Sequence, residues 1–371
     1  MNSPGDTHSR SMDCAELALL ARMRHDHDEA DRLFRESLEL ELAAIDEIKA
    51  EAVEPTFSIL HRSAATLALD CNNPQLAERL IATGLSHASP PEIREELRDL
   101  LEQVYFRRHL QLRGIDLEED EVQMSLAGQG VGFGVVHSQD FLERVEKASK
   151  LIYRIVDRRQ NRPFRTRGRL KKSIKDGYEV FLSVPRAASF AVTLKLGRPT
   201  AQAKLPGISD TAEVVDEFMN LMGLLSTGDF PSLEKAIPEA PYRTNFVQLA
   251  KRLAPDGEDV KIVGFTTMRA GQERFVEVSR SRRDIVVPES SLAEHATAER
   301  VSVRGILRFA DATHADSGKI KIVDEQSGVT HNVRVPEGMM GDIVKPLWEC
   351  LVVVTGREVG NYIVLDDIDG E

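Results

Sequence analysis

The chain has 371 residues, of which 42% are hydrophobic and 29% charged, and its formal net charge is −12. This composition is typical of a folded protein with two or three domains and excludes global disorder. No apolar run approaches the roughly 20 residues of a membrane-spanning helix, and the polar first residues predict no signal peptide. Three well-separated cysteines form no disulfide framework, so we expect a cytoplasmic protein.

After a disordered tail predicted at 1–10, residues 11–115 are predicted to be helical. Two segments match at an offset of 47 residues, pairing Ala18 with Ala65, Leu20 with Leu67, Ala21 with Ala68, Ala30 with Ala77, Leu33 with Leu80 and Phe34 with Ile81. Each segment predicts a helix, a polar turn and a second helix, with small residues at the helix crossing. A third helix pair is expected over 91–101 and 104–112. Because one helical hairpin cannot bury its apolar face, we expect these units to stack.

This pattern resembles the tetratricopeptide repeat, although the period is longer than that of the family. The resemblance is carried by Ala65, Ala68, Ala77, Ile81 and Gly84, with Pro90 or Pro91 after the second helix. It implies a superhelix that docks a protein or peptide partner. The alternative is a helical bundle that only packs on the next domain.

The turn sequence His25-Asp26-His27-Asp28 has metal-ligand residue types but predicts no metal site. Two histidines two residues apart cannot share a helix face. Nothing nearby completes a set of four ligands. We therefore expect a solvated turn.

Residues 120–290 predict an α+β domain with an antiparallel sheet. A strand over 122–127 leads into four alternating glycines, Gly128, Gly130, Gly132 and Gly134. Glycine allows close backbone approach, either to a phosphate or to a neighbouring strand. The spacing differs from that of a phosphate-binding loop that enters a helix. A packed turn is favoured, and a nucleotide-binding or phosphate-acting enzyme that uses these glycines is the alternative.

A helix over 139–160 is predicted from an apolar stripe at intervals of three and four residues, formed by Phe141, Val145, Ala148, Ile152 and Ile155. Asn161-Arg162-Pro163 ends it. The remaining elements of the domain are helices over 211–225, 231–237 and 243–253 and two strand pairs, 178–184 with 190–196 and 260–268 with 273–281.

The most unusual stretch is 150–175, which carries eleven basic side chains and one acid. Arginine pairs with phosphate through two hydrogen bonds, and an exposed loop over 162–175 could follow a nucleic-acid backbone. The candidate contact residues are Arg158, Arg159, Arg162, Arg165, Arg167, Arg169, Lys171 and Lys172. Two alternatives stay open: these cations pair with acids of the chain or of a partner, or they have no role.

Residues 298–371 predict the order β-β-β-α-β-β, which resembles the OB-fold, a five-stranded barrel. The resemblance implies a barrel of the kind that often binds single strands through stacked aromatic side chains and a basic groove. The segment is poor in both, since its only aromatic residues are Phe309, Trp348 and Tyr362. We expect Trp348 to fill the core, and a protein-contact or structural barrel is the alternative.

The sequence thus predicts a multidomain α+β protein with no catalytic motif, no metal site and no cofactor. The leading hypothesis is a non-enzymatic regulator or adaptor. Its helical region would dock a protein partner, and its basic loop 162–175 would contact nucleic acid or another polyanion. A purely structural interaction scaffold is a further alternative.

Overall fold

The computed structural model describes residues 4–24, 26–48, 53–87, 89–113, 117–128, 131, 136–165, 177–182, 190–197, 211–285, 299–312 and 317–370. The chain forms two compact units, Met1–Asp116 and Leu117–Glu371. The middle region and the C-terminal strands, which the sequence suggests as separate domains, thus belong to one unit.

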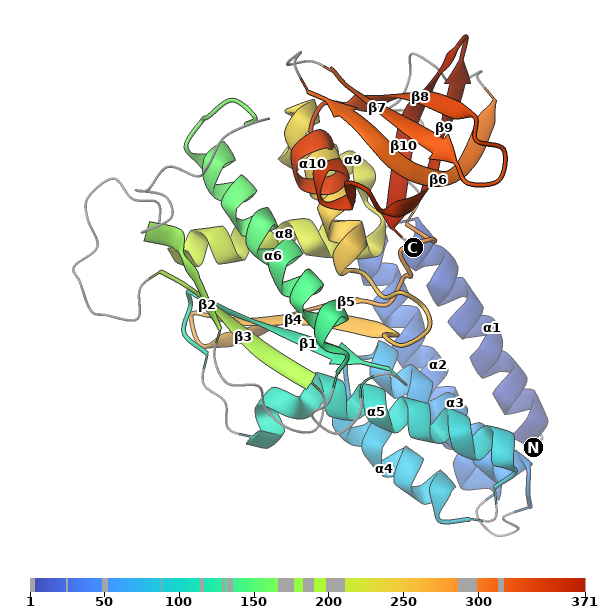
Figure 1. The fold of residues 1–371 in the computed structure, drawn as a ribbon. Helices are drawn as coiled ribbons and strands as arrows, with labels where there is room; N and C mark the ends of the chain where they lie inside the picture. The colour runs from blue at the N-terminus through green and yellow to red at the C-terminus, as the bar shows by residue number, and fades with distance from the viewer. Residues whose placement is uncertain are drawn as a thin grey trace. The chain divides into compact units, whose positions relative to one another are not determined.

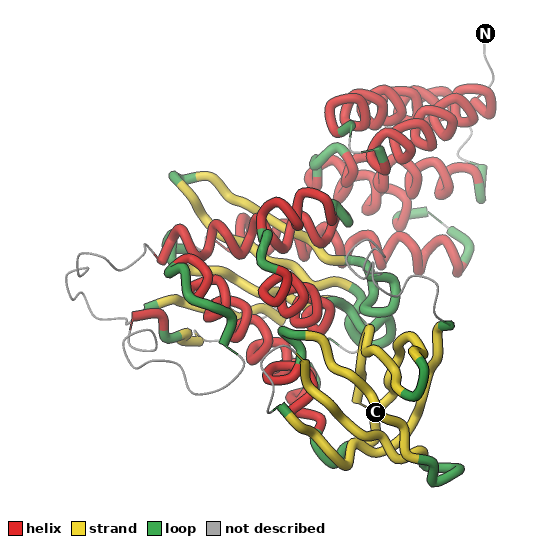
Figure 2. The backbone as a smooth tube through the Cα atoms, turned by 90° about the horizontal axis from the view of Figure 1, so that it is seen from above, coloured by secondary structure: helices red, strands yellow, loops and turns green. Residues whose placement is uncertain are grey.

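The N-terminal unit is helical, as predicted, and Figure 2 shows it as helices joined by loops. Its helices are α1 (Pro4–Met23), α2 (His27–Ile48), α3 (Thr56–Asp70), α4 (Pro74–Leu85) and α5 (Pro91–Arg113). The core holds the matched residues of both segments except the exposed Leu20, among them Ala18, Ala30, Phe34, Ala65, Ala77 and Ile81. Gly84 lies where α4 meets its neighbours, since an added Cβ would lie 3.0 Å from Leu97 Cδ1 and 3.3 Å from His61 Cβ.

Two details of this unit differ from the expectation. The predicted disordered tail is wrong from Pro4 onward, because α1 begins there. Contacts with α2 hold its first turns: Ser11 Oγ donates to the Ser37 carbonyl oxygen at 2.9 Å, and His8 Nδ1 lies 2.9 Å from Glu41 Oε1. The predicted third helix pair is instead one helix, α5. No glycine or proline interrupts the stretch between 101 and 104, so the helix continues.

The C-terminal unit begins with a five-stranded antiparallel sheet in the order β2-β3-β1-β4-β5. Its strands are β1 (Glu121–Ala127), β2 (Val180–Leu182), β3 (Phe190–Leu196), β4 (Ile262–Arg269) and β5 (Gln272–Val278). The helices of this region are α6 (Ser138–Arg159), α8 (Thr211–Thr227), α9 (Phe230–Ala236) and α10 (Ala240–Leu253). Each was predicted to within three residues at either end, because period-2 and period-3.6 patterns are both strong here.

The last five strands are β6 (Arg300–Asp311), β7 (Ser317–Asp324), β8 (Thr330–Pro336), β9 (Leu351–Val359) and β10 (Tyr362–Gly370). They pair in the ring β6-β7-β8-β10-β9 and back to β6, which closes the sheet into a barrel. Between β8 and β9 lie a short π-helix, Met340–Val344, and a 3-10 turn, Lys345–Leu347, where the sequence predicts a short helix.

Helices α6, α8 and α10 lie between the five-stranded sheet and the barrel (Figure 1). On the sheet side, Phe218 of α8 packs edge-on against Phe265 of β4, with 5.2 Å between ring centroids. On the barrel side, α10 makes polar contacts. Asn245 Nδ2 donates to the Gly338 carbonyl oxygen at 2.7 Å, and Gln248 Nε2 donates to the Asp366 carbonyl oxygen at 3.0 Å. These layers share one continuous apolar core, which makes them one unit.

Candidate nucleic-acid interface

The basic end of α6 is anchored by acids of the same unit. Arg158 donates to the Ala236 carbonyl oxygen at 2.7 Å and pairs with Glu217. Arg159 pairs with Glu213 and, at 2.8 Å, with Glu217. The hydrogen bond with Glu217 raises the pKa of Arg159. Both arginines therefore tie the end of α6 to α8, and their charges are matched inside the molecule.

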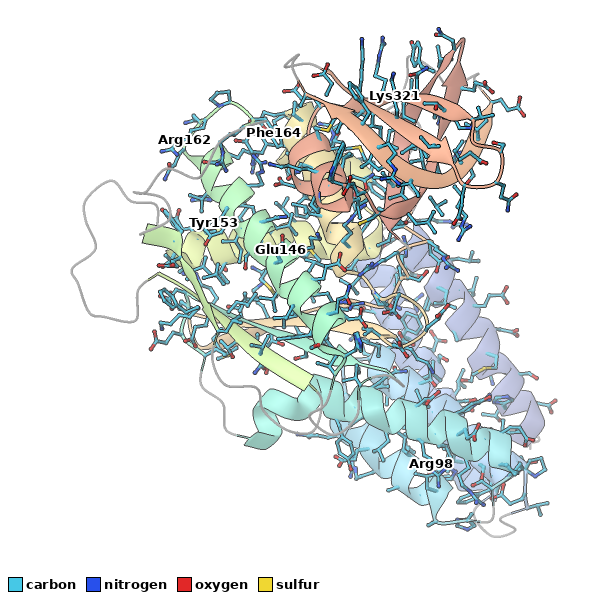
Figure 3. The ribbon with its side chains drawn as sticks, in the orientation of Figure 1. Arg98, Glu146, Tyr153, Arg162, Phe164 and Lys321 are labelled. Atoms are coloured by element: carbon cyan, nitrogen blue, oxygen red, sulfur yellow. The ribbon has the colours of Figure 1, made fainter. Side chains whose placement is uncertain are left out.

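The first residues after α6 are also paired. Arg162 and Arg165 lie 3.5 and 3.3 Å from the two carboxylate oxygens of Asp157, which is 3% exposed. Figure 3 shows Arg162 and Phe164 beyond the end of α6. Tyr242 donates a hydrogen bond to the Arg162 carbonyl oxygen at 3.1 Å. Burial raises the pKa of Tyr242 to about 12, so the phenol stays a donor. This part of the predicted loop is thus held against the unit.

Of the eight predicted contact cations, the structure describes these four, and it pairs all four with acids of the chain. Arg167, Arg169, Lys171 and Lys172 lie outside the described residues. The described pairs favour the internal salt-bridge alternative for Arg158, Arg159, Arg162 and Arg165. The partners of Arg158 and Arg159 on α8 lie more than 50 residues away along the chain.

Gly128, at the end of β1, has a packing role. An added Cβ would lie 2.3 Å from the Asp259 carbonyl oxygen and 2.7 Å from the Lys261 nitrogen. Lys261 in turn donates to the Ala127 carbonyl oxygen at 2.9 Å. The space that a phosphate would need at Gly128 is occupied by this neighbouring backbone. Gly130, Gly132 and Gly134 lie outside the described residues.

Basic and aromatic side chains gather on the outward side of the barrel over β6, β7, β8 and β10. We call this set the outward face: Phe309, Lys319, Lys321, Arg334 and Tyr362. Ile320 and Ile322 of β7 and Val333 of β8 are buried inside the barrel. Since side chains alternate across a strand, their neighbours point outward. The strand register places Phe309 opposite Lys321 and Lys319 opposite Arg334.

Two cation–π contacts organise the outward face. Lys321 Nζ lies 5.3 Å from the centroid of the Phe309 ring, and Arg334 Cζ lies 4.4 Å from that of Tyr362. Figure 3 labels Lys321 on the barrel. Phe309 remains 41% exposed. Within the described residues, no carboxylate forms an ion pair with Lys319, Lys321 or Arg334. The charge of this face is therefore available to an external anion.

Lys319, Lys321 and Arg334 are not among the contact residues predicted from the sequence. The signal was present, because each of these cations alternates with a buried aliphatic residue in its strand. A count of basic residues along the chain does not single out these three cations, whereas their alternation with apolar residues places them on one side of the sheet. The expectation for Trp348 is wrong: 47% of the side chain is exposed, because it follows the 3-10 turn at the barrel mouth instead of lying within a strand.

Among the described residues, no group of three or more His, Cys, Asp or Glu side chains could hold a metal ion. No helix in that part of the chain combines the length and apolarity needed to cross a bilayer. Comparison with protein-family models, with curated proteins and with solved structures finds no match to the chain.

Proposed function

We propose that the protein is a non-enzymatic adaptor that binds single-stranded nucleic acid through the outward face of its barrel and docks a protein partner through its helical unit. The observation that carries the first part is the outward face itself, where three cations without an acidic partner among the described residues lie beside the exposed ring of Phe309. Unpaired bases stack on such rings, while cations follow the phosphates.

The strand ring of the barrel supports this proposal. Its order β6-β7-β8-β10-β9, with a short turn segment between β8 and β9, fits the OB-fold resemblance. OB-folds that bind single strands use the outward surface of their second and third strands. Lys319, Lys321 and Arg334 lie on those two strands, β7 and β8. The four cations of 166–175 remain predicted contributors to the same polyanion contact.

The helical unit supports the protein-docking part. Its hairpins carry the tetratricopeptide-like residues in the core, which leaves other faces for a partner. Leu17 and Leu20, three residues apart in α1, are 54% and 41% exposed. Apolar side chains with this spacing form a stripe on one side of a helix that a partner's apolar side chains could cover.

The nucleic-acid proposal is tested by fluorescence anisotropy with labelled 20-nucleotide dT and U strands at several salt concentrations. We compare the native chain with the triple variant Lys319→Ala, Lys321→Ala, Arg334→Ala. The triple variant should bind more weakly, and its salt slope should fall by about 0.7 for each lost phosphate contact. Phe309→Ala should weaken binding by about 1–3 kcal/mol while the salt slope stays unchanged.

Arg304→Ala is the matched control, because Arg304 is a barrel arginine whose charge is already paired with Glu325 at 2.7 Å. A second variant replaces Arg167, Arg169, Lys171 and Lys172 with alanine. If binding is lost only in this variant, the contact surface is the basic loop 162–175 instead of the outward face. Absent or salt-independent binding by the native chain would refute nucleic-acid binding by either surface.

A further inference from the structure

A cavity of about 640 Å³ lies where the mouth of the barrel meets the end of α6. Small-molecule sites have volumes of this order, and barrel mouths are one of their usual places. Leu307, Ala310 and Met340 give the cavity apolar walls. Ala310 lies opposite the buried Ile320, on the inward side of the sheet. The cavity is therefore distinct from the outward face.

Trp348 is the aromatic side chain that lines this cavity, and 47% of it is exposed. Backbone hydrogen bonds fix the residues next to it against β6. The Glu349 amide donates to the Leu307 carbonyl oxygen, and the Leu307 amide donates to the Cys350 carbonyl oxygen, both at 3.1 Å. A tryptophan ring held open beside apolar walls can stack on a flat aromatic ligand.

The charges around the cavity favour an anion. Its lining contains the cations Arg154, Arg165 and Lys345 and one acid, Asp342. Asp342 is already matched, since Arg154 Nε and NH2 donate to its Oδ2 at 2.8 and 2.7 Å. Lys345 is exposed and has no ion-pair partner among the described residues. Arg165 is likewise matched, because it lies 3.3 Å from Asp157.

We propose that this cavity binds a nucleotide, with the base stacked on Trp348 and the phosphate held by Lys345. Stacking uses the flat ring and the apolar walls, and the phosphate uses the surplus positive charge of Lys345. A cation would be repelled by the same surplus. The nucleotide can be a free mononucleotide or the phosphorylated end of a strand. The site does not depend on the outward face and so goes beyond the proposed function.

The test uses the fluorescence of Trp348, which is the only tryptophan in the chain. The full chain is excited at 295 nm and titrated with AMP, with UMP and with a 5′-phosphorylated dT trinucleotide. N-acetyltryptophanamide corrects for light that the nucleotides absorb. Saturable quenching is expected. Lys345→Ala should weaken the apparent affinity about 10-fold, because a hydrogen bond to a charged group is lost, whereas Lys345→Arg should retain binding.

Ala310→Phe supplies an independent variant, because a larger side chain at the inward end of β6 would fill the cavity and prevent quenching. Arg304→Ala, at the barrel arginine already paired with Glu325, is the control that should leave the titration unchanged. Quenching by AMP or UMP that both cavity variants weaken would assign a free nucleotide. The same pattern with the trinucleotide alone would assign a strand end.

Absent quenching with all three probes would overturn the nucleotide site. So would quenching that persists unchanged in Lys345→Ala and Ala310→Phe. The proposed function fails separately: if the triple variant of the outward face binds long strands as well as the native chain while Trp348 quenching is intact, only the outward face is refuted.

Discussion

Arg154 joins the helical layer of the C-terminal unit to the segment between β8 and β9 of the barrel. Its guanidinium donates two hydrogen bonds to Asp342 and a third, at 2.9 Å, to the Arg165 carbonyl oxygen. It also lies over the Phe164 ring, with Cζ 4.3 Å from the centroid. The planar fork of arginine is suited to this combination, which a lysine could not reproduce. Asp342, held in place by Arg154, also lines the cavity.

Asp342→Ala should destabilise the C-terminal unit by about 3 kcal/mol. The change leaves the largely buried Arg154 without its carboxylate, and an uncompensated buried charge costs more than the intact pair contributes. Urea unfolding followed by Trp348 fluorescence, which reports on this unit alone, gives the measurement. The double variant Arg154→Met, Asp342→Ala should recover part of the loss. A double variant that is less stable than Asp342→Ala would contradict this account.

Gly128 provides a second prediction for a single residue. Gly128→Ala should destabilise the C-terminal unit by about 2 kcal/mol, because the new Cβ would clash with the backbone at 259–261. Gly223→Ala in α8 is the matched control. Its Cβ would meet only Val276 Cγ2 at 3.8 Å, and alanine should stabilise a helix interior by about 0.5–1 kcal/mol. Unfolding midpoints that move in opposite directions in the two variants would confirm the packing role of Gly128. A Gly128→Ala protein with the midpoint of the native chain would refute it.

Among the elements, the α1–α2 hairpin carries a buried carboxyl group. Glu41 of α2 is fully buried and faces His8 and Ser11 of α1. Burial raises the pKa of Glu41, although hydrogen bonds from His8 and Ser11 act in the opposite direction. The folded state therefore holds this proton more tightly than the unfolded state.

This raised pKa predicts how the stability of the hairpin depends on pH. The contribution of Glu41 is fully present below the unfolded pKa of about 4.3 and is lost as pH rises through the higher folded pKa. Glu41→Gln should remove that loss. Relative to the native chain, the free energy of unfolding of the variant should rise above pH 4.3, by about 1.4 kcal/mol for each unit by which the folded pKa exceeds the unfolded pKa. Thermal unfolding by circular dichroism from pH 4 to 8 tests this, with the exposed Glu39→Gln as control. If the unfolding temperatures of the native chain and of Glu41→Gln change with pH in parallel, the predicted effect of the Glu41 pKa is ruled out.

The same elements show what the sequence could predict. The apolar stripe of α6 and the alternation in β1 and β7 depend on neighbours within one helix or strand, so their bounds follow from local pattern. The start of α1 does not follow from local pattern. Pro-Gly-Asp-Thr has weak helix propensity, and the helix there is held by contacts with residues more than 25 positions away, such as Ser11 with Ser37.

The candidate site was harder to predict for the same reason. The sequence shows that Arg158 and Arg159 are basic, but their partners Glu213 and Glu217 lie on another helix. An ion pair at that separation exists only once α6 and α8 have packed together. The outward face likewise requires the register of β6 on β7 and of β7 on β8, which no local pattern specifies.

For the whole molecule, the two compact units each contain their own apolar core. Units with separate cores should unfold as separate cooperative transitions, so calorimetry of the full chain should resolve two. Glu41→Gln should shift only the transition of the N-terminal unit, and Asp342→Ala only that of the C-terminal unit. The two effects should add within about 0.5 kcal/mol in the combined variant, because the sites share no partner. A single transition that both substitutions move would show instead that the units fold as one.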